Sequence, residues 1–240
     1  EEVWNCTRCN WCKIAFGWAV KSERFHHNCP SFTLRKFNAY SAQGRMHIAR
    51  SLLEGEMEWE DSQKLLEIIY SCDTCGACAI NCMRIMENNP MEVLEALRAK
   101  AVELGIGPMP EHKSLAASIK SYDNPWSQPR RRRDEWTEDL AIKDLTKEKA
   151  EVLFYPGCTF SLGTKRIKEV LRVDAKIFAK AGLDFGCFLG GKEICCGSLL
   201  LRVGMYDLAK DLIKRNAEMI EKSGVKKIIT PCAGCYKTFK

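Results

Sequence analysis

The sequence of 240 residues lacks two features that would place a chain in a membrane or outside the cell. It has no apolar run of about 18 residues, the length that a membrane-spanning helix needs. It has no basic-then-apolar secretory leader and begins with Glu1, Glu2 and Val3. We therefore expect a trimmed start and a cytoplasmic location, with contact to the cytoplasmic face of a membrane only through a partner subunit.

Cysteine, by contrast, is abundant, with 14 residues. A secreted disulfide scaffold is one explanation for such a content. Those scaffolds are short and scatter their cysteines through loops, whereas ten of the 14 here lie in CxxC or CC arrays. Neighbouring thiols in such arrays are too close to pair with each other, so the pattern favours metal ligation.

The net charge of +6 would by itself favour nucleic acid or an anionic membrane surface as a partner. If the cysteines bind metal as thiolates, however, the resulting centres are anionic. Their negative charge offsets part of this basic excess. We therefore expect no nucleic-acid partner. The run Arg130–Arg133 is interpreted as the solvated face of a linker, or alternatively as a contact with an acidic partner protein.

Residues 1–104 carry the first eight cysteines between helical patterns, and no strand is expected there. Apolar residues at helical spacing predict one helix from Thr33 to Leu53. Asp61 is a suitable cap for a second helix. Pro90 fits the first turn of a third helix, which should end at Gly105. This region is predicted to be an α-helical ferredoxin-like domain.

Residues 105–148 are rich in Gly and Pro, and we interpret them as a surface linker with one helix around His112–Tyr122. The pattern changes over residues 149–240. Strand-like runs at 151–155, 183–189 and 226–230 alternate with helical patterns at 167–179 and 199–222. This alternation predicts a parallel sheet of the α/β type, so the whole chain is an α+β multidomain protein.

The predicted strands also predict where the last cysteines lie. Ligand sites of open α/β sheets gather at the carboxyl ends of the strands, and these cysteines follow strand ends. They should therefore converge in space. A helix starting near Cys235 would be cut short at Lys240, so we expect the polypeptide to continue and this domain to be incomplete.

The first eight cysteines form two similar arrays. They are Cys6, Cys9 and Cys12 followed by Cys29, and Cys72, Cys75 and Cys78 followed by Cys82. Two-residue gaps let one loop present three thiolates to one cubane, and in two-cluster ferredoxins the fourth thiolate comes from the other array. We predict a first [4Fe–4S] cluster on Cys6, Cys9, Cys12 and Cys82, and a second on Cys72, Cys75, Cys78 and Cys29.

The alternative for these arrays is a pair of four-thiolate zinc sites, although zinc sites generally use two separate CxxC knuckles. The chain departs from compact ferredoxins in two places. A long insert separates Cys12 from Cys29, and Met83 rather than Pro follows Cys82. His26 and His27 in the insert are alternative ligands, and the second interpretation is that they are surface residues.

The remaining pattern is Cys158, the Cys195-Cys196-Gly197 motif, and the Cys232-x2-Cys235 pair. Adjacent thiolates point in different directions, which suits separate irons better than one cubane. The pattern resembles the cysteine-rich CCG domain family. The order of ferredoxin module and then CCG motif is similar to the heterodisulfide reductase D-subunit-like family.

This resemblance implies a noncubane [4Fe–4S] cluster on five cysteines, which are Cys158, Cys195, Cys196, Cys232 and Cys235. In the family such a cluster cleaves a disulfide in two one-electron steps, which would make these cysteines catalytic. The family normally has a second CCG motif, and only one is present here. Cys187 fits neither pattern and is interpreted as a bystander that is buried or lies near a cluster.

The resemblance also implies the function of an iron–sulfur oxidoreductase subunit. Electrons would come from a flavoprotein, ferredoxin or cytochrome b partner, pass through the two cubanes and reach the CCG cluster, where a disulfide is reduced. The alternative is a non-catalytic subunit like those of glycerol-3-phosphate oxidation, lactate or glycolate oxidation, or benzoyl-CoA reductase. A third hypothesis is a zinc-stabilised interaction module.

Overall fold

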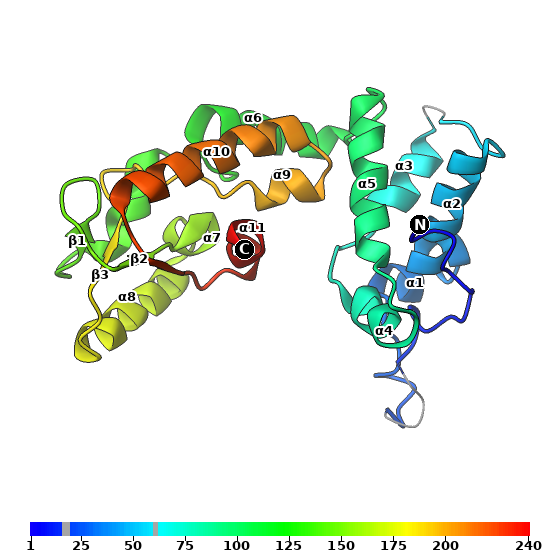
Figure 1. Cartoon of the computed structure of the whole chain (residues 1–240), viewed down its shortest axis with the longest axis horizontal. Coiled ribbons are helices and arrows are strands. Elements are labelled where there is room, and N and C mark those ends of the chain that lie inside the picture. The colour runs from blue at the N-terminus through cyan, green and yellow to red at the C-terminus, as the bar shows by residue number, and fades with distance from the viewer. Residues whose placement is uncertain (16–19, 60–61) are drawn as a thin grey trace. The chain divides into compact units, whose positions relative to one another are not determined.

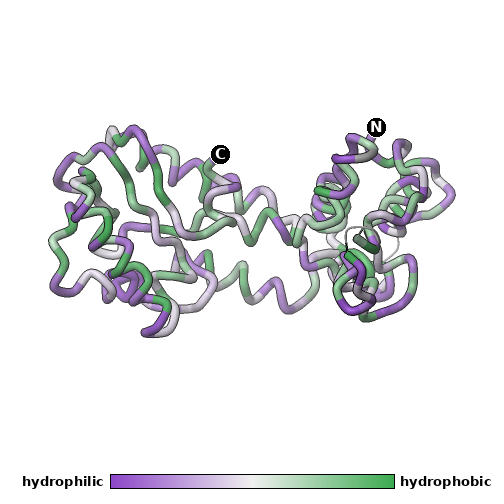
Figure 2. Tube along the Cα trace, turned by 90° about the horizontal axis from the view of Figure 1, so that it is seen from below, coloured by the Kyte–Doolittle hydropathy of each residue, from purple (hydrophilic) through white to green (hydrophobic). Residues whose placement is uncertain are grey.

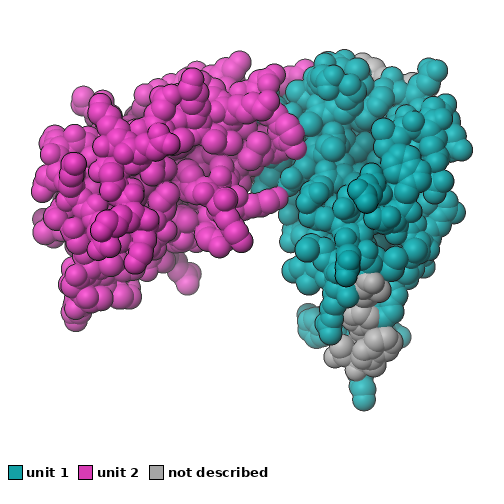
Figure 3. Space-filling model, in the orientation of Figure 1, with its two compact units in different colours: residues 1–109, 202–205 teal, residues 110–201, 206–240 magenta. Residues whose placement is uncertain are grey.

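The computed structural model describes residues 1–15, 20–59 and 62–240. These residues form two compact units, which Figure 3 colours separately. Unit 1 comprises Glu1–Met109 with Arg202–Met205, and unit 2 comprises Pro110–Leu201 with Tyr206–Lys240. In the described part of the chain, no helix is long and apolar enough to cross a bilayer.

Unit 1 is helical, as predicted (Figure 1). Its helices are α1 (Pro30–Arg35), the 3₁₀ helix η1 (Asn38–Tyr40), α2 (Ala42–Glu54), α3 (Gln63–Tyr70), α4 (Ala77–Met86) and α5 (Pro90–Glu103). The described residues of this unit contain no strand, and a single antiparallel bridge joins Ile14 to His27. The core lies between α2, α3 and α5, where Ala49, Ile69 and Leu94 pack together.

The prediction of one helix from Thr33 to Leu53 is wrong, because α1, η1 and α2 divide this stretch. Lys36 adopts a left-handed conformation (φ 54°) and ends α1. Ser41 then starts α2 by accepting a hydrogen bond from the Gly44 amide. Apolar spacing did not reveal the break, since a short turn between two helices hardly disturbs the period of the buried positions.

The other helix starts in unit 1 are closer to expectation. Pro90 begins α5 as predicted, and the Asn89 side chain caps it by accepting from the Met91 amide. Ser62 caps α3 by accepting from the Leu65 amide. Asp61, the expected cap, lies outside the described residues.

Gly44 on α2 provides a test of how closely α2 packs against η1. An added Cβ would lie 2.1 Å from the Asn38 carbonyl oxygen. Gly→Ala in an open helix stabilises by about 1 kcal/mol. Here we expect Gly44→Ala to destabilise unit 1 by about 1–3 kcal/mol, because the backbone of η1 must move. The apparent melting temperature measures this loss.

Gly55→Ala is the matched control for this substitution. No heavy atom lies within 4 Å of its added Cβ, so only the left-handed backbone (φ 74°) opposes the change. We expect it to cost about 1 kcal/mol. A Gly44→Ala variant at least as stable as the unsubstituted chain would contradict the packing of α2 on η1.

Unit 2 contains a four-stranded sheet with the order β1-β3-β2-β4, in which every pair is parallel. The strands are β1 (Lys143–Asp144), β2 (Val152–Phe154), β3 (Phe185–Cys187) and β4 (Lys227–Ile229). The helices are α6 (Pro110–Tyr122), the 3₁₀ helix η2 (Arg130–Thr137), α7 (Gly157–Ser161), α8 (Lys165–Lys180), α9 (Ser198–Arg202), α10 (Tyr206–Ser223) and α11 (Ala233–Phe239). The predicted parallel sheet is confirmed, and β1 is an additional strand.

Helices cover both faces of this sheet, with α8 on one side and α10 on the other (Figure 1). Along the trace of this unit, hydrophobic and hydrophilic stretches are interleaved (Figure 2). Side chains of β2 alternate between the faces. Phe154 packs in the cluster that contains Leu171 of α8, whereas Tyr155, next after the strand, packs in the cluster that contains Met219 of α10.

The interpretation of 105–148 as a linker is corrected by the structure, which places residues 110–148 in unit 2. The expected helix is present as α6. Beyond it, Trp136 is 2% exposed and meets Phe154 edge-to-face, with ring centroids 5.8 Å apart. β1 pairs with β3. The positions of Gly and Pro indicate where helices and strands end. They do not indicate whether the irregular segments between them are buried.

The single helix predicted over 199–222 is also wrong, since α9 and α10 are separate helices. Gly204 lies between them with φ 85°. An added Cβ at Gly204 would come within 2.3 Å of the Arg98 carbonyl oxygen, and both residues belong to unit 1. This close approach requires glycine and interrupts the helix.

Candidate functional site

Unit 1 contains two cavities, each lined by four cysteines. Cys6, Cys9, Cys12 and Cys82 line the first cavity, and Cys29, Cys72, Cys75 and Cys78 line the second. These are the two crossed sets that the spacing predicted. Pro90 lines both cavities, so they are neighbours.

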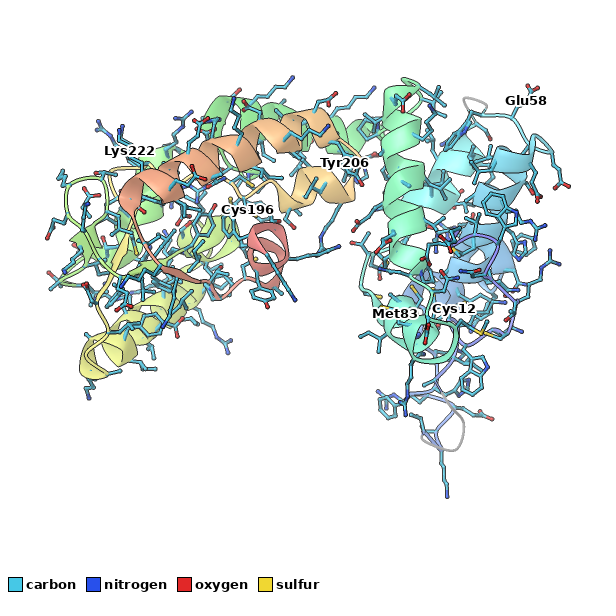
Figure 4. The ribbon with its side chains drawn as sticks, in the orientation of Figure 1. Cys12, Glu58, Met83, Cys196, Tyr206 and Lys222 are labelled. Carbon is cyan, nitrogen blue, oxygen red and sulfur yellow. The ribbon has the colours of Figure 1, made fainter. Side chains whose placement is uncertain are left out.

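The helix α4 explains how one array contributes to both cavities. Cys78 and Cys82 are four residues apart on α4 and so lie on one face of it. Cys78 lines one cavity, and Cys82 lines the other. Sequence reasoning placed Cys78 in a loop and did not predict α4. Figure 4 labels Cys12 from the first cavity and Met83, which is 55% exposed, on α4.

Burial controls the ionisation of the thiols in unit 1. It raises the pKa of Cys12 and Cys82 to about 11 and the pKa of Cys78 to about 12. Such thiols ionise when a metal displaces the proton, since the thiolate is the form that binds metals.

Two buried guanidinium groups lie beside the second cavity. Arg45, 3% exposed, lines it and donates to Ser31 Oγ (3.2 Å) and Ser71 Oγ (2.9 Å). Arg98, 4% exposed, donates to the Cys72 carbonyl oxygen at 2.7 Å. These cations suit an anionic group held by thiolates.

Both cavities fit an iron–sulfur cluster by the chemistry of their donors, because thiolates are soft ligands that suit such clusters. No three His, Cys, Asp or Glu side chains form a group that would hold a single metal ion in the ranges that the structure describes. His26 and His27 line neither cavity, and their rings lie 4.4 Å apart.

Unit 2 brings together the five cysteines of the CCG pattern at the carboxyl ends of its strands. Cys158 lies in α7 after β2, and Cys195 and Cys196 lie between β3 and α9 (Cys196 is labelled in Figure 4). Cys232 and Cys235 follow β4 at the start of α11. Their sulfurs form a continuous series of contacts in the order Cys158, Cys195, Cys196, Cys235 and Cys232.

Gly157 allows the backbone to pass close to the sulfurs. It has φ 74°, and an added Cβ there would lie 2.9 Å from Cys235 Sγ. At Gly234 the tight neighbour of an added Cβ would be Ser198 Oγ at 3.0 Å, with Cys232 Sγ in ordinary contact at 3.7 Å. A side chain at position 157 would therefore fill space that the thiols occupy.

Hydrogen bonds between the thiols lower the pKa of three of them and raise the pKa of the other two. Contacts with Cys195 and Cys235 lower the pKa of Cys196, and a contact with Cys235 lowers that of Cys232 to about 6. Cys195, followed by Arg133, lowers the pKa of Cys158. The pKa values of Cys195 and Cys235 rise in return. Buried thiolates next to thiols form a set of soft donors, which fits iron.

Sequence reasoning missed Arg133, which is 2% exposed and lies beside this site. Its guanidinium donates to Cys158 Sγ at 3.1 Å and pairs with Glu193 at 2.7 Å. The solvated or partner-facing interpretation of the arginine run is therefore wrong for Arg133. Arg130–Arg132 are exposed, and nothing in four consecutive arginines shows which one turns inward.

Glu193 and Asp123 also support the five-cysteine site and were not predicted. Burial raises the pKa of Glu193 to about 7, although Arg133 opposes this shift. The Asp123 carbonyl oxygen accepts from the Cys195 amide at 2.8 Å and from Arg133 at 3.0 Å. Nothing in the sequence around a charged residue of an irregular segment indicates that it lies beside a buried site.

Cys187 lies in β3 and is 2% exposed. It packs in the core cluster that contains Trp136, and burial raises its pKa well above the ordinary value. It is not part of the series of sulfur contacts and shares a small cavity with Arg133 and Glu193.

Known families match both parts of the chain. A 4Fe-4S dicluster domain matches residues 2–84, and a cysteine-rich CCG domain matches residues 152–240. These two ranges agree with the positions of the paired cavities and of the five-cysteine site. No solved structure shows a significant match.

Characterised relatives are similar over most of the chain. The D subunits of the dihydromethanophenazine:CoB–CoM heterodisulfide reductases of Methanosarcina mazei and Methanosarcina acetivorans are 29% and 30% identical over all of this chain, which spans 57% of each relative. The EtfAB:quinone oxidoreductase of Syntrophomonas wolfei is 30% identical over 72% of this chain and 25% of its own length. This chain thus spans little more than half of the reductase subunits that it matches. It belongs to the heterodisulfide reductase D-subunit-like family of iron–sulfur proteins, which join a 4Fe–4S dicluster domain to a cysteine-rich CCG domain.

Proposed function

We propose that this chain is an iron–sulfur electron-transfer part of a heterodisulfide reductase-like complex. The observation that supports it most is the grouping of 13 of the 14 cysteines into two four-cysteine cavities and one five-cysteine site. We assign Cys6, Cys9, Cys12 and Cys82 to one [4Fe–4S] cluster, and Cys29, Cys72, Cys75 and Cys78 to another. The five CCG cysteines hold the third cluster.

The protein residues in unit 1 keep the two cluster sites close together. Bound there, the clusters supply one-electron transfer. Pro90 separates the cavities with one side chain, and α4 joins them through Cys78 and Cys82. Arg45 and Arg98 balance the negative charge of the second site. This arrangement favours electron transfer between the sites.

The third site supports a different geometry. A cubane has four iron corners, whereas five sulfurs converge here and two of them come from adjacent residues. We therefore propose a noncubane [4Fe–4S] cluster with a disulfide as the substrate class, as the name of the related reductase indicates. A flavoprotein, ferredoxin or cytochrome b-type partner would supply the electrons, at the cytoplasmic face of the membrane.

The second candidate function is electron conduction without a substrate at the CCG site. The similarity to an EtfAB:quinone oxidoreductase favours it, because that name describes a different electron acceptor. The two functions differ in one property of the third site. A substrate-cleaving site must be open to a thiol, and a conducting site need not be.

Metal analysis tests the proposed function. Anaerobically purified chain is expected to contain about twelve irons and as much sulfide, about eight in the two cubanes and about four in the third site. Zinc in place of iron would overturn the proposal and support an interaction module. About eight irons would retain the dicluster domain and refute the third cluster.

Exposure to a thiol then separates the two candidate functions. In an oxidised sample, the electron paramagnetic resonance signal of the third site is expected to change when a small thiol is added, because a thiolate half of the substrate binds there. An unchanged spectrum in a sample with about twelve irons favours conduction.

A further inference from the structure

The buried ion pair of Arg133 and Glu193 lies next to the five-cysteine site and is not explained by cluster ligation. The side chains are 1% and 5% exposed. Taking both charges out of water is costly, and an apolar pair of similar shape is often as stable or more stable. Stability is therefore a poor reason for an arginine at this position.

The contacts hold the guanidinium of Arg133 in one orientation. Nη1 donates to Glu193 Oε1 at 2.7 Å and to Ser161 Oγ at 3.3 Å. Nη2 donates to the Asp123 carbonyl oxygen at 3.0 Å and to Cys158 Sγ at 3.1 Å. Nε is buried with no partner among the described residues. One N–H group is thus aimed at the sulfur of Cys158 by contacts from three other residues.

The chemistry of this contact concerns the charge of the site. Hydrogen bonds to cluster sulfurs and nearby charge are the means by which proteins set cluster potentials. Arginine does not lose its proton in proteins, so its charge is permanent. Arg133 contacts Cys158 Sγ directly, whereas Glu193 pairs with the guanidinium and accepts a hydrogen bond from the Gly157 amide, next to Cys158.

We propose that Arg133 is a positioning residue that orients Cys158 and raises the reduction potential of the CCG cluster, and that Glu193 limits this effect. The inference rests on the proposed function of the five cysteines. One-electron reduction makes the site more negative by one charge, and the fixed cation stabilises that state. The electron comes from the dicluster domain, or from dithionite in the test.

The test uses the opposite charges of the pair. Glu193→Gln keeps a hydrogen-bonding side chain but removes the carboxylate charge that balances the positive charge of Arg133. Its CCG cluster is expected to be easier to reduce by at least tenfold in the equilibrium constant, or about 59 mV for one electron. Redox titration of the full chain, followed by electron paramagnetic resonance at one pH, measures the shift.

The double variant Arg133→Gln/Glu193→Gln removes both charges together. It avoids the buried, unpaired carboxylate that Arg133→Gln alone would leave. Its cluster is expected to be at least tenfold harder to reduce than that of Glu193→Gln, and also harder to reduce than that of the unsubstituted chain. A purely structural role would alter iron content or stability without moving the potentials in opposite directions.

Arg132→Gln is the matched control, because Arg132 is an exposed neighbour that pairs with Glu135. Its potential should equal that of the unsubstituted chain. An unchanged or lowered potential in Glu193→Gln overturns the inference, and this variant alone decides if the double variant does not fold. Failure of the proposed function is distinguishable, since the unsubstituted chain would then hold no iron beyond the two cubanes.

Discussion

Replacing Cys29 and Cys72 together by alanine is expected to remove about four irons per chain, no more than either single replacement removes. Both residues line the second cavity, with Cys75 and Cys78. A cubane that has lost one thiolate is already lost, so a second loss from the same site adds nothing. Iron and sulfide analysis measures the effect. It does not require the spectroscopic signals of the individual clusters to be resolved.

The matched comparison is the pair Cys29→Ala and Cys6→Ala. These residues line different cavities although they come from the same array. Their double variant is expected to lose about eight irons. If instead the Cys29 and Cys6 losses do not add and the Cys29 and Cys72 losses do, each array holds its own cluster and the crossed assignment is wrong. Cys187→Ala should lose no iron, because Cys187 lies in the core of unit 2.

Gly157→Ala is expected to empty the five-cysteine site while both cubanes stay bound. The added Cβ would lie 2.9 Å from Cys235 Sγ, and the backbone has φ 74°. The sulfur cannot retreat without leaving Cys196 and Cys232, which it contacts. Iron content should fall by about four, and the signals of the dicluster domain should stay.

Gly182→Ala controls for backbone strain in this experiment. Its φ of 69° is similar, but no heavy atom lies within 4 Å of the added Cβ. Both variants bear the cost of a left-handed alanine, about 1 kcal/mol, and only Gly157→Ala adds the contact with sulfur. Equal iron in Gly157→Ala and Gly182→Ala would mean that Cys235 is not a ligand or that the site adapts.

Local sequence patterns predicted some elements of the fold and missed others. Pro90 and the parallel strands were predicted because each leaves a local signal, the fixed φ of proline or a short apolar run. The break between α1 and α2 was missed because one left-handed residue, Lys36, interrupts the helix without a Gly or Pro. The strand β1 has two residues and forms only by pairing with β3.

The cysteine spacing by itself determined most of the candidate sites. Two-residue gaps limit which thiols reach one cluster, so the crossed grouping could be predicted before any fold was known. The carboxyl ends of parallel strands likewise predicted that five distant cysteines would converge. These are consequences of short loops and of chain direction, and both can be deduced from sequence.

Only the tertiary structure decided which charges accompany those cysteines. Arg133, Glu193 and Asp123 come from three separate segments of unit 2, and Arg45 and Arg98 come from two helices of unit 1. A side chain acquires such a partner when packing buries it and removes water as the competing ligand, which no local pattern encodes. The sequence therefore determined that this chain holds iron–sulfur sites in two domains, and the fold determined the electrostatic surroundings of each site.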